Sequence, residues 1–266
     1  MEFNIRVGVH GFWVAGGTGE SILLSDEEEP AALPKSPPTR TRGASPPLCT
    51  WAHPPPPAPP PWPNTRLGVG VEAICCVPPF FYGQSDESIV EHYRIVAAAA
   101  DLPLLICTCP NPPTWRSAPP LMRKIQEYMP QLAAQHSAPY QGYVRDFANM
   151  GLACFVGNCR LMLPAMTIGA VGCVDGPPNM VPERWVALWN AYQSGDLTAA
   201  QAAQEHASKV ADLVRPYKFH AIAKAVLSYR LGIDCGVPRP PMAALSAEEQ
   251  RELMEGVRKL EIEPGG

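Results

Sequence analysis

A glycine-rich segment near the amino terminus constrains the fold of this chain more than any other feature. Residues 16–20 read Gly-Gly-Thr-Gly-Glu and directly follow the apolar run 11–15, which predicts a short strand. Glycine lets the backbone turn sharply and approach a small ligand closely. Ser25, followed three residues later by Glu28, forms a capping-box pattern that predicts the start of a helix. The order of strand, turn and helix predicts a βα-loop, where parallel α/β proteins place their chemistry.

The spacing of these glycines excludes two common phosphate-binding signatures. It does not match the G-x-G-x-x-G pattern of dinucleotide-binding proteins, and no Gly-Lys-Ser/Thr follows it as in a phosphate loop. A glycine-rich βα turn can also serve only to reverse the chain. The loop by itself therefore leaves both a ligand-binding role and a purely structural role open.

Composition narrows the class of protein. The 266 residues are 46% hydrophobic, which is enough for a sizeable core, and a net charge of -4 argues against nucleic-acid binding. No apolar run reaches 18 residues, so we expect no membrane span, and the first six residues do not resemble a signal peptide. Nine scattered cysteines form no paired framework or metal-ligand set, which predicts free thiols in a reducing cytoplasm and no bound metal.

A proline-rich segment interrupts the chain at 30–67. It is nearly devoid of aliphatic residues and has no hydrophobic periodicity, so it predicts a disordered or polyproline II stretch. Such a segment is unusual inside a compact domain and indicates an insertion or a misassigned exon junction. The alternative is a P-x-x-P ligand for an SH3-like partner.

The remaining sequence alternates strand and helix patterns and then becomes helical. Strands are predicted at 71–77, 102–107, 153–157 and 169–174, helices at 85–100, 120–128 and 161–167, while 132–149 gives no clear pattern. From residue 181 only helices are predicted, at 182–194, 198–213, 219–231 and 246–260. This order predicts an α/β barrel fragment at 1–29, the proline-rich segment at 30–67, further barrel strands and helices at 68–180 and a helical extension at 181–266.

Five segments together resemble one family. They are the glycine loop at 16–20, the aromatic Pro-Pro-Phe-Phe-Tyr at 78–82, the Leu-Pro strand at 101–106 followed by Pro110, the Gly-Ala-Val-Gly at 169–172 and the Pro-Arg-Pro-Pro-Met at 238–242. In this order they resemble the family of N-acetylneuraminate lyase and dihydrodipicolinate synthase. The sequence is similar to an incomplete or disrupted member of that family.

The resemblance implies a (β/α)8 TIM barrel with class I aldolase chemistry and no cofactor. A lysine would form a Schiff base with pyruvate or another 2-keto acid, including a sialic or sugar acid. Gly17 and Thr18 would bind the substrate carboxylate, Val174 would contribute from the last-strand loop, and Phe81 and Tyr82 would form the aromatic loop. Family membership also implies a homo-oligomer, such as a homotetramer.

Two catalytic positions of the family are altered in this chain. The tyrosine that relays protons corresponds to Cys107, whose side chain is shorter. The Schiff-base lysine should follow the helix at 120–128, but the chain has no lysine between Lys124 and Lys209.

The lysine position corresponds to Gln135 or His136 in one register and to Arg145 in another. None of these side chains can form an imine, since an amide is not nucleophilic and arginine stays protonated. We expect His136, like His206 and His220, to have an ordinary structural role.

Several functions stay open at this stage. The arginine that synthases carry just after the strand-five proline is absent at 111–115, which favours a lyase of the N-acetylneuraminate type, impaired by the missing lysine. The alternatives are a 4-hydroxy-tetrahydrodipicolinate synthase-like enzyme, or a catalytically dead homologue that still binds a 2-keto acid. We also expect an incomplete barrel that lacks two of the eight strands, because the proline-rich segment takes the place of one of them.

Overall fold

The chain divides into a unit that contains the strands and a unit that is helical. The computed structural model describes residues 1–24, 47–51, 73–79, 83–98, 102–108, 119–137, 142–215 and 218–265. We call His10–Gly157 with Pro164–Val174 the barrel unit, and Met1–Val9 with Asn158–Leu163 and Asp175–Gly266 the helical unit. The candidate site residues that the structure brings together all lie in the barrel unit.

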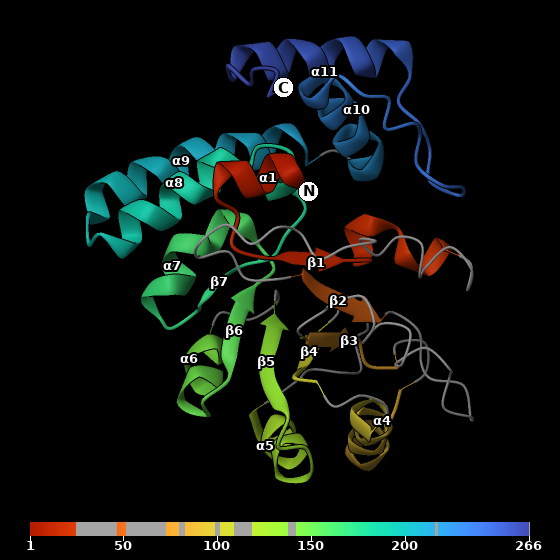
Figure 1. Ribbon diagram of the computed structural model, residues 1–266, viewed down its shortest axis with the longest axis vertical. Coiled ribbons are helices and arrows are strands. Elements are labelled where there is room, and N and C mark those ends of the chain that lie inside the picture. Colours follow the sequence, from red (N-terminus) through yellow and green to blue (C-terminus); the bar gives the residue numbers. More distant parts are fainter. Residues whose placement is uncertain are drawn as a thin grey trace. The chain divides into compact units, whose positions relative to one another are not determined.

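Strands of the barrel unit lie side by side in chain order, and each neighbouring pair is parallel (Figure 1). The described strands are β1 (Phe12–Val14), β2 (Pro47–Trp51), β3 (Ala73–Cys76), β4 (Leu104–Thr108), β5 (Leu132–Ser137), β6 (Ala153–Val156) and β7 (Gly172–Cys173). Parallel neighbours require a crossover after each strand. The carboxyl ends of all these strands therefore lie at the same edge of the sheet.

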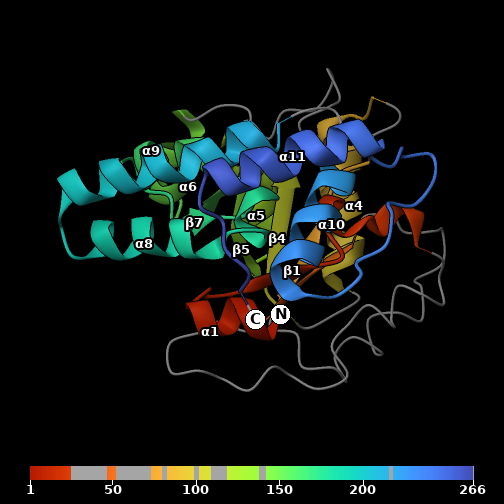
Figure 2. The same ribbon diagram turned by 90° about the horizontal axis from the view of Figure 1, so that it is seen from above.

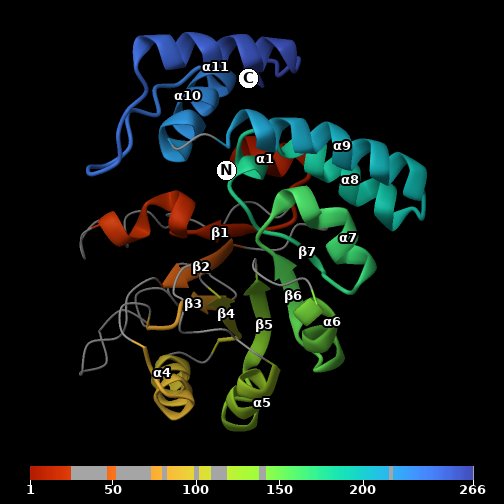
Figure 3. The same ribbon diagram turned by 180° about the vertical axis from the view of Figure 1, so that it is seen from behind.

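Three of these crossovers contain a helix of eight residues or more, and the shorter α7 (Met162–Thr167) lies between β6 and β7. The three longer helices are α4 (Asp86–Ala98), α5 (Pro119–Tyr128) and α6 (Gly142–Asn149), and neighbours among them contact one another (Figure 3). In α4, the buried residues Ile89, Tyr93 and Val96 recur at helical spacing and form one apolar face. The Ser85 hydroxyl accepts a hydrogen bond from the backbone N–H of Ser88 at 3.2 Å, so this helix begins where its cap predicts.

The pleat of the strands gives the sheet two chemically different faces. The inner face holds a buried cluster against which further apolar and sulfur-containing side chains pack; its members are Ala73, Cys75, Leu105, Ala134, Trp13, Cys107, Ala153 and Phe155. The outer face carries the alternate residues and faces the helices. There the Tyr93 hydroxyl of α4 donates to the carbonyl of Cys76 at 3.5 Å.

A contact between two distant strands shows that the sheet curls. The Trp13 ring of β1 lies 5.0 Å, centroid to centroid, from the imidazole of His136 in β5. These strands are separated by three others in the sheet, so their side chains can meet only if the sheet closes around its inner face. The predicted α/β barrel is confirmed by this parallel, curled arrangement.

The helical unit follows the barrel strands and confirms the predicted helical extension. Its long helices are α8 (Pro182–Gln193), α9 (Leu197–Leu213), α10 (Phe219–Leu231) and α11 (Ala247–Lys259), and the short α1 (Glu2–Val7) contacts α8. Helices α8 and α9 lie side by side (Figure 2). Short helical turns complete the described elements: η1 (Gly17–Gly19), η2 (Ser21–Leu23), η3 (Cys159–Leu161), α7 (Met162–Thr167) and η4 (Pro177–Asn179).

A buried arginine holds the helical unit together. Arg230 of α10 is only 5% exposed and forms an ion pair of 2.9 Å with Glu183 of α8. Its guanidinium also donates to the carbonyls of Met180 at 2.7 Å and Glu263 at 3.1 Å. The planar guanidinium thereby joins α8, α10 and the segment after α11 through several donors at once.

The structure differs from the sequence-based expectation at the proline-rich segment. Strand β2 lies within 30–67, where no regular structure is predicted, and it pairs with β1 and β3. Its sequence, Pro-Leu-Cys-Thr-Trp, explains the difference, because proline is tolerated as the first residue of a strand and the residues after it favour strands. The described residues thus provide seven strands, two more than the five predicted individually and one more than a barrel that lacks two of its eight strands would have. Ser25 and Glu28 lie outside the described residues.

No described helix has the length and apolarity that a bilayer crossing requires.

Candidate active site at the carboxyl ends of the strands

The glycine loop follows β1 at the edge of the sheet where the strands end. Gly17–Gly19 forms a single helical turn, closed by a hydrogen bond from the Gly19 N–H to the Gly16 carbonyl at 2.9 Å. Gly17 and Thr18 are exposed, and a Cβ added at Gly17 would meet nothing within 4 Å. The turn therefore leaves the Gly17 backbone and the Thr18 side chain accessible at the surface. The N–H groups of Gly19, Glu20 and Ser21 are used by hydrogen bonds within the turn itself.

The loop is bounded by two residues in a conformation that side chains rarely adopt. Ala15 has a φ of 55° and Glu20 a φ of 58°, both in the left-handed region. Residues other than glycine are uncommon there, and the strain persists only where the surroundings impose it. The shape of the turn is therefore specified by its surroundings as well as by its glycines.

A thiol and an imidazole meet where β4 and β5 end. The Sγ of Cys107 lies 3.3 Å from the Nδ1 of His136, within hydrogen-bond range for sulfur. The two residues are direct partners in the parallel register of these strands, so both point to the inner face. Each is partly buried.

The second nitrogen of the imidazole determines which tautomer is present. The Nε2 of His136 lies 2.9 Å from the backbone carbonyl oxygen of Val174, just after β7. A carbonyl can only accept, so Nε2 carries the hydrogen and donates it. In the neutral ring, Nδ1 then has a lone pair directed at the Cys107 thiol. The Trp13 ring packs edge-on against the same imidazole and restricts its rotation.

The surroundings of Cys107 favour the thiolate. The pKa of Cys107 is lowered from 9.0 to about 5, and a hydrogen bond from Cys75 on β3 is the largest cause. Burial opposes this shift, whereas the hydrogen bond and charge of His136 support it. Cysteines on the outer face behave in the opposite way, since burial raises the pKa of Cys76 and of Cys154 to about 12. The inner face is thus the side of the sheet on which an ionised thiol is stabilised.

The structure separates the two residues proposed for the lysine position on β5. Gln135 is fully buried on the outer face, where its Oε1 accepts a hydrogen bond from the Cys154 thiol at 3.3 Å. Its neighbour His136 faces inward. Arg145, the candidate of the other register, lies exposed on helix α6 rather than on a strand.

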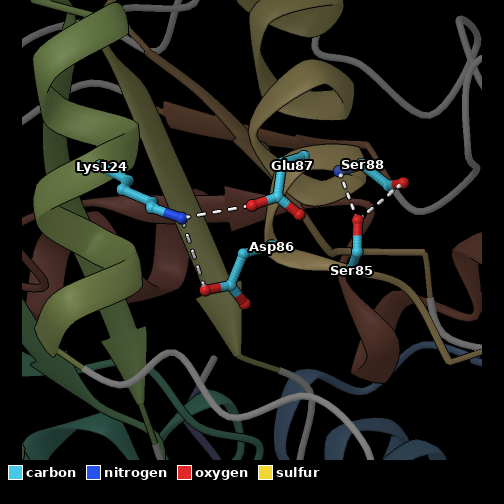
Figure 4. A network of polar contacts seen from close by, with 5 residues as sticks. All are labelled: Ser85, Asp86, Glu87, Ser88 and Lys124. Carbon is cyan, nitrogen blue, oxygen red and sulfur yellow. Dashed lines mark hydrogen bonds and ion pairs between the residues drawn. The ribbon is translucent and has the colours of Figure 1, made fainter.

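The lysine nearest to this region in the sequence lies in the outer helical layer. Lys124 belongs to α5, and its Nζ lies 3.4 Å from the Oε1 of Glu87 and 4.0 Å from the Oδ2 of Asp86, both on α4 (Figure 4). This exposed pair of helices covers the outer face of the sheet. Within the described ranges, none of the strands carries a lysine.

Some predicted site residues are brought together and others are not placed. Cys107, His136 and Val174 meet on the inner face, and the loop with Gly17 and Thr18 lies at the same strand edge. Phe81 and Tyr82 lie outside the described residues.

Sequence reasoning did not foresee that Trp13 and the Val174 carbonyl contact His136, or that Cys75 contacts Cys107. The signal available in the sequence was the alternation along β5, in which Ala134 and His136 share a face that Gln135 does not.

Comparisons with known proteins agree with this architecture. Residues 63–260 match the Dihydrodipicolinate synthetase family. The chain belongs to that family. An uncharacterised DapA-like lyase from Halobacterium salinarum is 27% identical over 252 residues, which cover 94% of this chain and 82% of the relative.

Two solved structures with the same fold carry names that denote different activities. A putative dihydrodipicolinate synthetase from Pseudomonas aeruginosa superimposes with a TM-score of 0.83 at 21% identity, covering 97% of this chain and 90% of that one. The sialic acid aldolase of Ruminococcus gnavus gives a TM-score of 0.82 at 20% identity, covering 97% of this chain and 88% of that one. The likeness establishes the TIM-barrel fold of the family, and the chain is a member of this group of aldolases and lyases.

Proposed function

We propose that this protein binds a 2-keto acid at the carboxyl ends of its strands and does not process it through a Schiff base. One observation carries the proposal: the inner face of β4 and β5 presents Cys107 and His136, where the family resemblance calls for a tyrosine and a lysine. We propose that it descends from carbon–carbon lyases of the N-acetylneuraminate lyase type and that the missing lysine impairs this activity.

The chemistry of imine formation supports the absence of turnover. An uncharged primary amine must attack the keto carbon, and lysine is the side chain that supplies it. Lys124 is turned toward acidic partners on the outer helices, and none of the described strands carries a lysine. An imidazole can accept and donate protons, but it cannot replace the amine as the electron sink for carbon–carbon cleavage.

The glycine loop supports retained binding. Its turn leaves Gly17 and Thr18 exposed, and the family resemblance assigns these two residues to the substrate carboxylate. Hydrogen bonds to a charged group contribute about 1.5–3 kcal/mol each. Binding can therefore survive the loss of the catalytic lysine, because the carboxylate contacts come from a different strand.

We expect Thr18→Val to weaken pyruvate binding about tenfold, since one donor to a charged carboxylate is lost. Isothermal titration calorimetry measures the affinity, with Thr167→Val as the matched control. The Thr167 hydroxyl donates to the carbonyl of Pro164 near the end of α7, so its removal leaves binding unchanged.

Borohydride treatment with pyruvate, followed by mass spectrometry, should give no lysine adduct. A trapped adduct would contradict the missing Schiff base, and an absence of measurable binding would contradict the 2-keto-acid site.

The substrate type within the family is a second part of the proposal. The missing arginine after Pro110 favours a sialic or sugar acid over the substrates of a 4-hydroxy-tetrahydrodipicolinate synthase-like protein. Displacement of bound pyruvate by N-acetylneuraminate is the expected result, because both carry a 2-keto-carboxylate. Pyruvate binding that N-acetylneuraminate does not displace would favour the synthase type.

The cellular setting and assembly are also proposed. The described cysteines Cys75, Cys76, Cys107, Cys154, Cys159, Cys173 and Cys235 are free thiols, which agrees with a reducing cytoplasm. Family resemblance supports a homo-oligomer. Analytical ultracentrifugation of the full chain distinguishes an oligomer from a monomer.

A further inference from the structure

We propose that Cys107 and His136 form a nucleophile–base pair that captures the carbonyl carbon of a 2-keto acid as a reversible thiohemiketal. This inference rests on the proposed binding function and adds a covalent step to it. The ligand class is a carbonyl compound made electrophilic by an adjacent carboxylate.

The geometry has the three parts that an activated nucleophile requires. The nucleophile, Cys107, lies 3.3 Å from the base, His136 Nδ1. The base is oriented by a third group, the Val174 carbonyl, which accepts from Nε2 at 2.9 Å. A nucleophile hydrogen-bonded to a base that a third group orients is the general arrangement of activated serine and cysteine sites.

Neighbouring groups agree with an ionised sulfur at this position. Cys75 on β3 donates a hydrogen bond to Cys107, and among the described residues the thiol of Cys76 and the phenol of Tyr93 also interact electrostatically with Cys107. Burial keeps Cys76 and Tyr93 neutral by raising their pKa values. They add no competing negative charge near the Cys107 thiolate.

The step balances without any further reactant. The Cys107 proton passes to His136 Nδ1, and the sulfur attacks the keto carbon to form a C–S bond. The electron pair of the carbonyl π bond moves to oxygen, which takes the proton back from His136 Nδ1. Nothing is oxidised or reduced, and no water leaves. Because the product contains no iminium group, it has no electron sink, so capture occurs without carbon–carbon cleavage.

The position of the pair relative to the carboxylate loop also fits this chemistry. Both the loop after β1 and the ends of β4 and β5 lie at the carboxyl edge of one curled sheet. The contact between Trp13 and His136 shows that β1 approaches β5 across the inner face. A carboxylate held by the loop would thus lie on the same side of the sheet as the thiol.

The first experiment measures thiol reactivity without any ligand. Iodoacetamide alkylation of the full-length protein is followed at each cysteine by peptide mass spectrometry at pH 6. Cys107 should react faster than Cys235, which is also partly exposed but belongs to the helical unit. His136→Gln should slow Cys107 on the order of tenfold, since the thiolate fraction falls while the remaining thiolate becomes more nucleophilic. Equal rates at the two cysteines, or an unchanged rate in His136→Gln, would overturn the activated pair.

The second experiment observes the adduct. Carbon-13 NMR of the protein with pyruvate labelled at C2 should show a new tetrahedral-carbon resonance that disappears in Cys107→Ser and on dilution. Circular dichroism confirms that each variant is folded. Calorimetric binding of pyruvate without this resonance would overturn the thiohemiketal and leave the binding function intact. An absence of pyruvate binding would overturn both the thiohemiketal and the binding function. The alkylation rate of Cys107 would then still show whether its thiol is activated.

Discussion

At the scale of single residues, one step along β5 decides which chemistry the inner face can carry. Gln135 and His136 are adjacent in sequence, and both are candidates for the lysine position. The pleat places Gln135 on the outer face beside Cys154 and His136 on the inner face beside Cys107. A one-residue difference in register therefore separates a buried amide from an imidazole that faces the inner side beside a thiol.

This difference gives a direct prediction. The double variant His136→Lys with Cys107→Tyr places an amine and a phenol on the inner face, and it should form a borohydride-trapped adduct with pyruvate. Gln135→Lys should give none, because its amine would be buried on the outer face without a charged partner, which also destabilises the fold.

Arg145→Lys serves as the folded control for that comparison. Its amine lies exposed on α6, so the variant should be as stable as the parent and form no adduct. Mass spectrometry of the reduced samples reads out all three variants. An adduct on the lysine introduced at position 135 or at position 145, instead of on the inner face, would contradict the assignment of faces.

At the scale of elements, two Arg–Glu pairs among the described residues differ in their surroundings. Arg230 is buried and joins α8, α10 and the chain after α11, whereas Arg94 pairs with Glu91 on the exposed surface of α4 at 2.7 Å. Removing Arg230 leaves the Glu183 carboxylate and two backbone carbonyls without their donor. Breaking a buried pair in this way costs about 3–5 kcal/mol. Exposed pairs contribute little, because water and salt screen them.

We therefore expect Arg230→Met to lower the free energy of unfolding by about 3 kcal/mol. Arg94→Met, the matched control, should leave it unchanged within error. Urea unfolding followed by circular dichroism measures both variants. Similar losses in the two variants would show that Arg230 acts by covering surface rather than by its buried hydrogen bonds.

Elements with a strong local signal could be predicted from the sequence. The cap at Ser246 and the acidic first turn that follows predict α11, and the structure shows the complete capping box with Glu249. Strand β5 could not be predicted, because Leu-Ala-Ala-Gln-His-Ser combines weak strand formers and owes its conformation to pairing with β4 and β6. Strand β2 was missed for another reason: its residues favour strands, but the prolines around it hide so short a run, and pairing with β1 and β3 stabilises it.

The candidate site shows the same limit. The turn at residues 16–20 after a strand could be predicted, because its residues are contiguous in sequence, and its carboxylate-binding role stays a prediction. The cluster of Cys75, Cys107, His136 and the Val174 carbonyl could not, since its members come from four separate strands or strand ends. Only the closure of the sheet brings them together.

At the scale of the whole molecule, the ionised thiol links the stability of the fold to pH. The pKa of Cys107 is lowered from 9.0 to about 5 by the hydrogen bond from Cys75 and by His136. Between these values the folded chain holds a thiolate, whereas the unfolded chain holds a protonated thiol. The unfolded state then binds more protons, so stability rises with pH across this range and is lost as pH falls through the folded pKa.

Other titratable groups limit the pH interval in which the contribution of Cys107 to stability can be measured separately. Burial lowers the pKa of His92, and burial together with nearby positive charge lowers that of His206; both contribute a rise in stability that is complete above about pH 6.5. The buried thiols of Cys76 and Cys154, with pKa values raised to about 12, act in the opposite sense once the unfolded thiols ionise near pH 9.

The free energy of unfolding should therefore increase from about pH 7 to about pH 8.5 in the parent protein and decline above about pH 9. In Cys107→Ser the increase should vanish while the decline persists, because serine does not ionise in this range and burial, the largest cause, still raises the pKa values of the outer-face thiols. Urea titrations at half-unit pH intervals measure the two profiles, and an equal increase in both proteins would show that the Cys107 thiol is not ionised in the folded chain.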